Sequence, residues 1–277
     1  MDGAEIRTAC INPQKAPIGV IQCVHGFGEG IIHYVELAEF LIRLGFACVI
    51  HDQRGHGEMP GLTPKQKYSA QGISPGYAYF LHDIKTVRTM INHIYPNLPV
   101  ILYGHSMGGN IAINYLMHAQ HEYQKAILEA PWLRLYKPIN SVSLALAKLL
   151  GRISPNLAVN TTLNKTHICR SEERIKSLET DGCYHNRISF RLIAEITVAG
   201  EAAIKNAKKI IIPTLLLCPA ADKIVCPNAI RAFHQNSGEN MTMIEYADGY
   251  HALRSDLIRD KVLADIAHFI KSKSIPQ

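Results

Sequence analysis

One serine of the sequence stands where a nucleophile would. Ser106 lies in the run GHSMGG at 104–109, which directly follows an apolar run at 100–103 and opens a stretch with helical spacing. Glycines beside the serine permit a sharp strand-to-helix turn, because larger side chains would collide with neighbouring backbone. The amino end of the following helix favours a developing oxyanion through its free N–H groups and its dipole. The pattern predicts that Ser106 is a catalytic nucleophile.

A serine hydroxyl needs a base at neutral pH, and the base needs an acid to orient it. With this type of turn the chain order is serine, then aspartate or glutamate, then histidine. Asp222 follows an apolar run at 210–217, and His251 follows another at 241–246. Both fall on loops at the carboxyl ends of predicted strands, where open α/β sheets bind their ligands. Asp248 is a rival acid, but it precedes His251 by three residues in the same loop, so the sequence favours Asp222.

A glycine-rich loop, HGFGEG at 25–30, follows the first apolar run, at 18–24. It lacks the third glycine of a dinucleotide-binding fingerprint, because Ile31 occupies that position. Small residues at this place let a backbone N–H reach a substrate oxygen. The sequence predicts that the N–H groups of Phe27 and Met107 form an oxyanion hole, with a simple tight turn as the alternative for this loop.

Short apolar runs bounded by turn residues predict the strands that position these loops. Near-continuous aliphatic and β-branched runs are typical of strands covered on both faces, as in parallel sheets. Stretches with helical spacing lie between them, and this alternation predicts an α/β fold with a mostly parallel sheet and helices on both faces. The predicted strands are 18–24, 47–50, 99–103, 126–128, 210–217 and 241–246.

The alternation breaks once, between residues 132 and 205. A stretch of this length without a comparable strand is too long to be a simple crossover connection between two strands. It predicts a helical cap inserted between two parts of a core, 1–131 and 206–277. A helical decoration with no role at the site is the alternative. Amphipathic helices are expected within the insertion around 142–153 and 188–196.

The first of these helices carries one apolar stripe. The stripe either buries itself against the sheet domain, or it lines an acyl channel or touches a lipid interface. The second possibility makes Leu146, Leu149 and Leu150 candidate substrate contacts, since each buried methylene of an acyl chain contributes about 0.8 kcal/mol. Val142 and Ile153 complete the stripe.

Composition excludes several other classes of protein. The 277 residues are 47% hydrophobic and 19% charged, which is typical of a folded domain and not of a disordered or fibrous chain. The formal net charge of +6 comes from scattered Lys and Arg residues without a basic stripe, which argues against nucleic-acid binding. No apolar run approaches the length of a membrane span, and the first seven residues contain no apolar stretch for a signal peptide.

Cysteine and histidine usage indicates a reducing compartment and no metal site. None of the seven cysteines forms a C-x-x-C pair, and Cys23, Cys48 and Cys218 sit in apolar runs, as expected for buried thiols in the cytoplasm. His118 and His121 share a helix face, but without a third ligand they predict no metal site. We expect no cofactor.

The order of these motifs resembles that of the monoglyceride lipase and lysophospholipase branch of the serine α/β-hydrolases, from about residue 16 to residue 270. The resemblance implies an eight-stranded sheet, a helical cap between strands six and seven, and hydrolysis of esters that carry one acyl chain. The family usually has a histidine directly after the Gly-Glu pair, whereas here Gly30 and two isoleucines precede His33. The matching pieces are HGFGE (25–29), Tyr34, LA (37–38), DQRGHG (52–57), GHSMGG (104–109), AP (130–131), YHNRIS (184–189), AD (221–222) and GYH (249–251).

The sequence therefore predicts a serine carboxylic-ester hydrolase that acts through an acyl-enzyme on a monoacylglycerol or a lysophospholipid-like ester. His251 would take the Ser106 proton, Asp222 would hold the imidazole tautomer, and water would release the acyl group. Two alternatives stay open, a small-molecule receptor with weak hydrolysis and an acyltransferase that uses an alcohol other than water. The expected partners are the ester or monoacyl lipid and, transiently, a membrane surface in contact with the cap.

Overall fold

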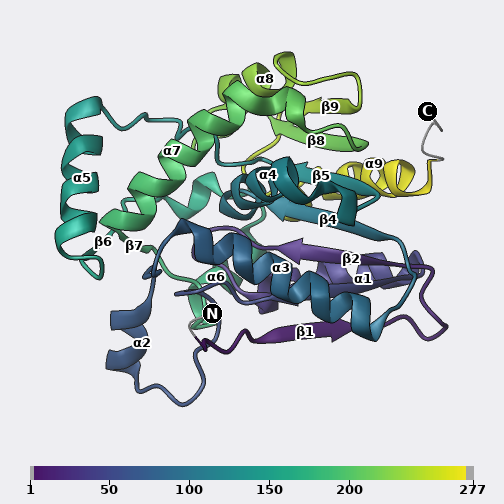
Figure 1. The fold of residues 1–277 in the computed structure, drawn as a ribbon, viewed down its shortest axis with the longest axis horizontal. Coiled ribbons are helices and arrows are strands. Elements are labelled where there is room, and N and C mark those ends of the chain that lie inside the picture. The colour runs from purple at the N-terminus through teal and green to yellow at the C-terminus, as the bar shows by residue number, and fades with distance from the viewer. Residues whose placement is uncertain (1–2, 273–277) are drawn as a thin grey trace.

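The computed structural model describes residues 3–272, which fold around one sheet of seven strands (Figure 1). The strands are β1 (Thr8–Ile11), β2 (Gly19–Val24), β3 (Phe46–His51), β4 (Val100–His105), β5 (Lys125–Glu129), β8 (Thr214–Pro219) and β9 (Met241–Tyr246). Their order across the sheet is β1-β3-β2-β4-β5-β8-β9, and all neighbours are parallel except β1 and β3. The prediction of a mostly parallel α/β sheet is confirmed.

Helices cover both faces of the sheet. The helices of the described residues, including those that lie away from the sheet, are α1 (Val35–Arg43), α2 (Pro64–Ala70), α3 (Tyr77–Ile94), α4 (Met107–Ala119), α5 (Ser141–Ile153), α6 (Glu172–Thr180), α7 (Phe190–Asn206), α8 (Pro227–Gln235) and α9 (Arg259–Lys271), with the short 3-10 helices η1 (Ile31–Tyr34), η2 (Gln120–Glu122), η3 (Lys165–His167), η4 (Ala207–Lys209) and η5 (Leu253–Ser255). α1 and α9 pack on one face, and α3, α4 and α8 on the other. Successive side chains of a strand point to opposite faces, so Val20 and Val24 of β2 join one core while Ile21 and Cys23 join the other.

Two expectations about the sheet are wrong for the described residues. The sheet has seven strands and not eight, and the insertion lies between β5 and β8, the fifth and sixth strands along the chain, and not between the sixth and seventh. The five described residues before β1 are too few for a turn and a further strand, so β1 forms the edge. β1 itself was not predicted, because it is short and its side chains are only partly buried.

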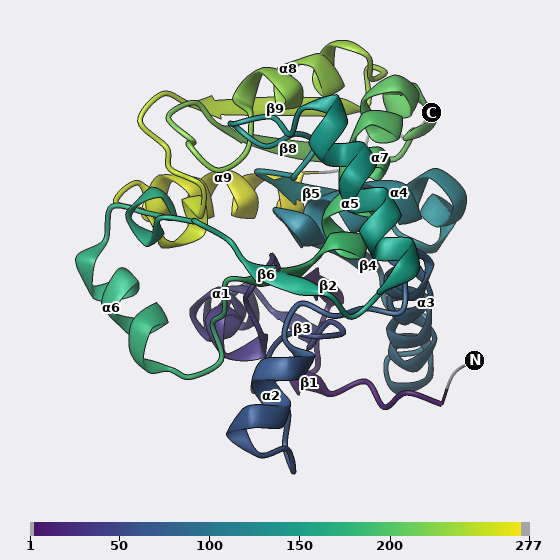
Figure 2. The ribbon, with the colours of Figure 1, turned by 90° about the vertical axis from the view of Figure 1, so that its left-hand side faces the viewer.

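The insertion, residues 132–205, contains α5, α6, nearly all of α7, and an antiparallel pair of short strands, β6 (Ala158–Asn160) and β7 (Arg187–Ser189). Figure 2 looks onto the side where the parallel strands end, and α5, β6 and α6 lie across that side. α7 belongs to both parts of the fold, because it contacts α5 while its Ile196 and Ile204 lie in the core with α4 and α8. A Cβ at Gly200 would lie 2.1 Å from the carbonyl oxygen of Leu133, so glycine permits this close packing of α7.

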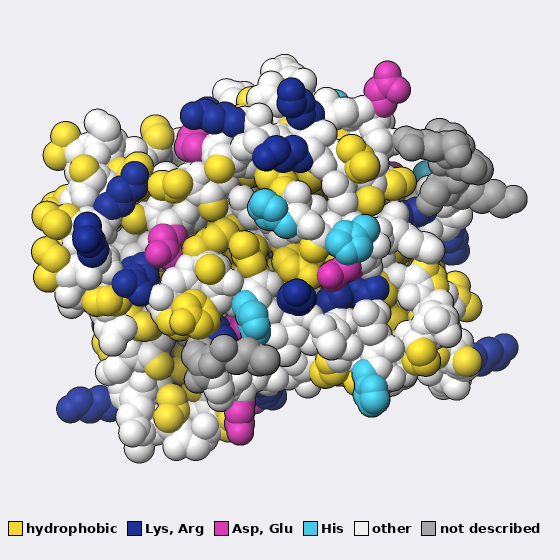
Figure 3. Space-filling model, in the orientation of Figure 1, with side chains coloured by type: hydrophobic (Ala, Val, Ile, Leu, Met, Phe, Trp, Pro, Cys, Tyr) yellow, Lys and Arg dark blue, Asp and Glu magenta, His cyan; other side chains and the backbone are white. Residues whose placement is uncertain are grey.

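The apolar stripe of α5 faces away from the rest of the protein. Val142, Leu146, Leu149 and Ile153 are 77%, 52%, 54% and 71% exposed, and Leu150 is partly buried. Packing of the whole stripe against the sheet domain, which was one expectation, is therefore wrong. The other expectation, that Leu146, Leu149 and Leu150 line an acyl channel, is also wrong, since none of them lines the cavity beside Ser106. In Figure 3 hydrophobic side chains gather at the left edge, over α5, with basic side chains beside them.

Small residues on the opposite side of α5 form its buried contact. Ala147 and Gly151 are buried, and α5 packs on α7. A Cβ at Gly151 would lie 2.7 Å from the Cα of Arg191, so the two helices approach this closely because the position is glycine. The amphipathic pattern predicts the helix correctly, but the small residues and not the large ones mark its buried side.

We expect Leu149→Ser to change the free energy of unfolding by less than about 0.5 kcal/mol, because this side chain is already half exposed. Ile196→Ala, in the fully buried part of α7, should lower it by about 2–5 kcal/mol. Denaturant unfolding of the two variants measures the difference. Equal losses would mean that the stripe is buried after all.

Candidate active site

The turn between β4 and α4 holds Ser106 in an unusual backbone conformation. β4 ends at His105 and α4 begins at Met107, so Ser106 is the single residue between them. Its φ of 52° lies in the left-handed region, which costs a residue other than glycine about 1–3 kcal/mol. Gly108 permits the turn, because a Cβ there would lie 2.1 Å from the carbonyl oxygen of Val24. The packing around the turn thus presents the serine hydroxyl to the adjoining cavity.

The structure brings Asp222 and His251 to Ser106. His251 Nε2 is 2.8 Å from Ser106 Oγ, and His251 Nδ1 is 2.7 Å from Asp222 Oδ2. The carboxylate accepts the Nδ1–H, which leaves Nε2 as the acceptor for the serine hydroxyl. Two backbone N–H groups just after Asp222 donate to its Oδ1 and fix the carboxylate. The rival acid Asp248 is exposed and makes no contact with this chain of hydrogen bonds in the described residues.

The two predicted oxyanion donors border the same site. Phe27 lies in the loop after β2, and Met107 is the first residue of α4. Within residues 3–272 neither N–H donates a hydrogen bond to another protein group. Glu29 shapes the loop, because its Oε2 accepts the N–H of Gly26 at 2.8 Å. The arrangement fits an oxyanion hole, a role that stays a prediction.

A buried charge cluster, Glu29–Arg254–Glu129, lies behind these loops and was not predicted. Arg254 Nη2 donates to Glu29 Oε1 at 2.6 Å, while its Nη1 and backbone N–H donate to the two oxygens of Glu129 at 3.2 and 3.0 Å. The hydroxyl of Tyr34 donates to Glu29, and that of Tyr103 donates to Glu129. All five side chains are buried. The cluster joins the loop after β2, the end of β5 and η5, three segments far apart in the sequence.

The charges of this cluster hold each other ionised. Burial would raise the pKa of Glu29, but the Arg254 guanidinium beside it holds the pKa of this carboxyl well below its usual value. Burial would also raise the pKa of Glu129, but the charge of Arg254 and the hydrogen bonds from Tyr103 and from the Arg254 backbone N–H favour the carboxylate, and the pKa of this carboxyl is lowered. The cluster also reaches the nucleophile, because the backbone N–H of Ser106 donates to the Glu129 carbonyl.

Four further histidines near the site are neutral at physiological pH. Burial lowers the pKa of His25, His56 and His185 to about 3. Burial, followed by the charge of Arg254, lowers the pKa of His105 to about 4. These imidazoles are therefore weak bases, whereas His251 is the histidine that hydrogen-bonds to Ser106 Oγ in the described residues.

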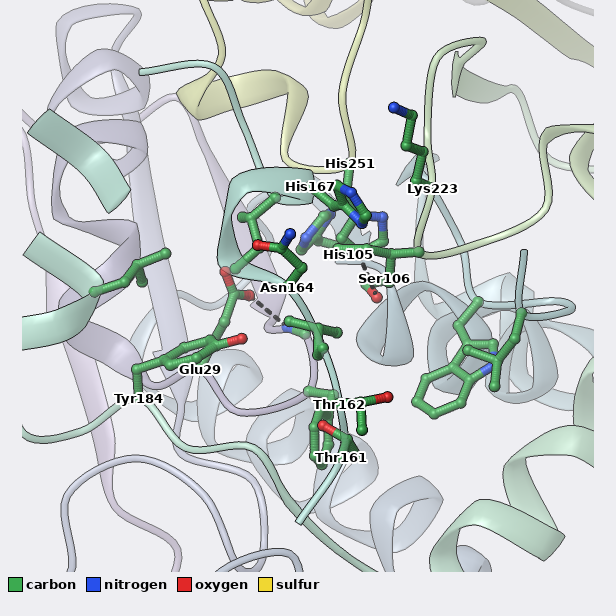
Figure 4. Close-up of a pocket in the computed structure, with 18 of the residues that line it drawn as sticks. Glu29, His105, Ser106, Thr161, Thr162, Asn164, His167, Tyr184, Lys223 and His251 are labelled. Carbon is green, nitrogen blue, oxygen red and sulfur yellow. Dashed lines mark hydrogen bonds between the residues drawn. The ribbon is translucent and has the colours of Figure 1, made fainter. Parts of the chain in front are cut away.

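A cavity of about 300 Å³ opens beside Ser106 (Figure 4). In this view Glu29 and Tyr184 lie on one side, Lys223 lies on the other, and Ser106 with His251 lies between them. The insertion supplies much of the lining. Its apolar contributions are Trp132, Leu135, Leu163, Ile168, Leu178 and Ile193.

The displaced histidine noted in the sequence links the core to the insertion. His33 Nδ1 accepts the N–H of Gly30 at 2.9 Å, and His33 Nε2 donates to Asp181 Oδ2 at 2.7 Å. Arg174 of α6 donates to the His33 carbonyl at 2.8 Å. The side chain therefore positions residues near α6 and lies outside the lining of the cavity.

Residues 3–272 contain neither a metal-binding cluster nor a membrane-spanning helix. No group of three or more His, Cys, Asp or Glu side chains is placed to hold a metal ion. No helix in this range has both the length and the apolar character needed to cross a bilayer.

A mostly parallel sheet with a strand–serine–helix turn and an Asp–His–Ser hydrogen-bond chain defines the serine α/β-hydrolases. The chain belongs to this class and, within it, to the family described as serine aminopeptidase S33, which matches residues 15–257. Its similarities place it in the monoglyceride lipase branch.

Three comparisons illustrate these similarities. An uncharacterized abhydrolase domain-containing protein of Dictyostelium discoideum is 26% identical over 264 residues, which cover 94% of this chain and 27% of that protein. A putative monoglyceride lipase of Schizosaccharomyces pombe is 28% identical over 243 residues, 86% of this chain and 62% of that protein. The chain thus spans less than two thirds of the length of either relative. The crystal structure of a Paleococcus ferrophilus monoacylglycerol lipase has a TM-score of 0.86 and 27% identity, and covers 96% of this chain and 98% of its own.

We expect Arg254→Gln to lower the free energy of unfolding by about 3–5 kcal/mol near pH 8, because it leaves buried carboxylates without their cation. In the wild type their lowered pKa keeps both carboxylates ionised, so their contribution is lost only as the pH falls below about 4.5. In the variant, burial raises their pKa, and proton uptake relieves the penalty as the pH falls. Urea unfolding at about pH 8 and about pH 5 measures both free-energy differences.

Arg134→Gln is the matched control for this prediction. Arg134 pairs with Glu201 at 2.5 Å on the surface, so its removal should cost at most about 1 kcal/mol at either pH. Equal losses for the two arginine variants would contradict the interpretation of the cluster. A loss in the free energy of unfolding of Arg254→Gln that is the same at both pH values would also contradict it.

Proposed function

We propose that this chain hydrolyses carboxylic esters of monoacyl lipids through a serine acyl-enzyme. The observation that carries the proposal is the hydrogen-bond chain from Asp222 through His251 to Ser106, set in the wall of a largely apolar cavity. Membership of the monoglyceride lipase branch supports the same reaction class. The seven free cysteines support the cytoplasmic location expected from the sequence.

The proposed reaction begins when Ser106 Oγ attacks the ester carbonyl carbon and His251 Nε2 accepts the hydroxyl proton. Asp222 holds the imidazole tautomer and stabilises the imidazolium. The N–H groups of Phe27 and Met107 donate to the tetrahedral oxyanion. His251 then protonates the leaving alcohol, and water attacks the acyl-enzyme with the same histidine as base, which releases the fatty acid.

The size and lining of the cavity support a substrate with one acyl chain. The volume is about 300 Å³, and the insertion contributes most of the apolar lining. Each methylene buried there contributes about 0.8 kcal/mol to binding. A second chain would have to share this space beneath the insertion, so the proposal favours monoacyl lipids over diacyl and triacyl lipids.

We expect Ser106→Ala to abolish covalent labelling by a fluorophosphonate and to reduce kcat for a p-nitrophenyl ester by at least about a thousandfold, because the variant lacks the attacking oxygen. His251→Ala should cause a loss of similar size. Intact-protein mass spectrometry measures the labelling, and release of p-nitrophenol measures the turnover.

Ser69→Ala, which changes an exposed serine of α2, is the matched control and should keep wild-type labelling and turnover. Retention of more than about a tenth of kcat by Ser106→Ala would contradict the assignment of the nucleophile. Labelling of the wild type without turnover of any ester would favour a receptor, and turnover that requires an added alcohol would favour an acyltransferase.

The outward-facing stripe of α5 supports transient contact with a lipid surface. Val142, Leu146, Leu149 and Ile153 expose a row of aliphatic side chains on the insertion, and Lys148 and Arg152 are exposed on the same helix. Apolar residues flanked by basic ones are typical of helices that lie on anionic membranes. Of the two roles that the sequence suggests for this stripe, we therefore propose contact with a lipid interface and not the lining of an acyl channel.

We expect the double variant Leu146→Ser, Leu149→Ser to lower turnover of monoacylglycerol presented in anionic vesicles by at least about fivefold, because it removes apolar area that enters the bilayer. Hydrolysis of a water-soluble butyrate ester should fall by less than about twofold, since neither residue lines the cavity. The control Ile211→Ser removes an exposed aliphatic side chain outside the insertion. Equal loss on both substrates would contradict membrane contact through α5.

A further inference from the structure

One motif of the insertion, YHNRIS at 184–189, lies against the loop after β2 and has no part in the proposed reaction. The backbone N–H of His185 donates to the carbonyl of Gly28 at 3.1 Å. Gly28 has a φ of 75°, and a Cβ there would lie 2.2 Å from the His185 carbonyl oxygen. Glycine at this position therefore lets the backbone of the insertion lie directly on the loop that contains Phe27.

The side chain of His185 contacts Phe27 itself. The two rings are roughly perpendicular, with centroids 5.6 Å apart and an angle of 82° between their planes. His56 makes a second perpendicular contact with Phe27 at 5.5 Å, and the two imidazoles lie 4.8 Å from each other. His185 Nε2 donates to the carbonyl of Gly55 at 2.9 Å, which fixes the orientation of its ring. Edge-to-face contacts of this kind restrain the Phe27 ring between the insertion and the loop after β3.

The backbone on either side of Phe27 is held by different parts of the fold. Before it, the N–H of Gly26 donates to Glu29, a member of the buried charge cluster. After it, the carbonyl of Gly28 accepts the N–H of His185. The Phe27 N–H donates to no other protein group of the described residues, so its direction is set by these flanking restraints and by the ring contacts.

His185 is placed to act on the reaction only through this loop. It is 6% exposed and does not line the cavity beside Ser106, so it neither binds substrate nor receives its proton. An oxyanion donor acts only at hydrogen-bond distance from the developing charge, and a displacement of about 1 Å can lower the rate about a hundredfold. Loss of the restraint on Phe27 would therefore slow the chemical step.

We infer that His185 is a positioning residue that holds the Phe27 N–H in the oxyanion hole, so that the insertion completes the catalytic site. This inference rests on the proposed hydrolase function. A histidine that only kept the insertion in place would act on binding of the acyl chain, because the insertion supplies most of the apolar lining of the cavity. Misplacement of the Phe27 N–H lowers kcat, whereas a loosened insertion raises KM.

The test compares two substitutions of similar size. His185→Leu removes the imidazole and its hydrogen bond to Gly55, and His185→Gln keeps an amide N–H that can donate to the same carbonyl. We expect His185→Leu to lower kcat for p-nitrophenyl octanoate at least about tenfold, while KM changes by less than about twofold. His185→Gln should keep kcat within about threefold of the wild-type value.

A second measurement reports on the oxyanion itself. Octyl trifluoromethyl ketone adds to the Ser106 hydroxyl and forms a tetrahedral hemiketal oxyanion, whereas octyl methyl ketone binds largely without addition. The ratio of the two affinities cancels changes in binding of the chain, and we expect His185→Leu to lower this ratio at least about tenfold. Phe27→Leu removes the other ring of the contact and keeps the backbone N–H. It should also lower the ratio, and it provides the test if His185→Leu does not fold.

Arg174→Gln is the matched control, because it breaks another hydrogen bond between the insertion and the core, at the carbonyl of His33, without involving Phe27. It should keep the wild-type kcat and ketone ratio. Thermal unfolding checks that each variant is folded. An unchanged ketone ratio in the folded Leu variants, or a rise in KM alone, overturns the inference. If the wild type neither hydrolyses the ester nor binds the trifluoromethyl ketone, the proposed hydrolase function fails instead.

Discussion

Arg254 supplies the positive charge on which the arrangement of the site depends. A buried carboxylate without a partner is too costly to persist, so Glu29 and Glu129 can lie beneath the site only if the guanidinium lies between them. Each of the three then restrains a different part of the machinery. Glu29 accepts the N–H of Gly26 in the predicted oxyanion loop, the Glu129 carbonyl accepts the N–H of Ser106, and Arg254 follows His251 by three residues.

The sequence predicts Ser106, Asp222 and His251 because each has a local signature. Glycines around a strand–helix junction mark the serine, and position after an apolar strand marks the other two. Arg254 and Glu129 have no such signature, because their contact joins residues that are 125 positions apart in the sequence. A single charged residue, considered without its partner, is expected to lie on the protein surface. The only available signals were an acidic residue at the end of a buried strand and an arginine beside the predicted base.

The same contrast applies to the fold. Six strands were predicted because continuous apolar runs are typical of strands covered on both faces, whereas β1 and the strand pair of the insertion are short and half exposed. The stripe on α5 shows a second limit. Helical periodicity reveals that one side of a helix is apolar, but it does not say what covers that side, and here Ala147 and Gly151 make the buried contact.

Because α7 belongs both to the insertion and to the core, it limits how such insertions can change during evolution. α7 closes the insertion and also covers the sheet, so the insertion is not a module that can be exchanged at the ends of the 132–205 segment. The separable part ends near Ser189, just before α7, because most of the buried side chains of that helix lie in the core with α4 and α8. A foreign segment grafted ahead of α7 would also need a small residue where Gly151 lies against Arg191. Diversity of lids on this scaffold is therefore expected to accumulate between β5 and the first turn of α7, with the rest of that helix inherited together with the sheet.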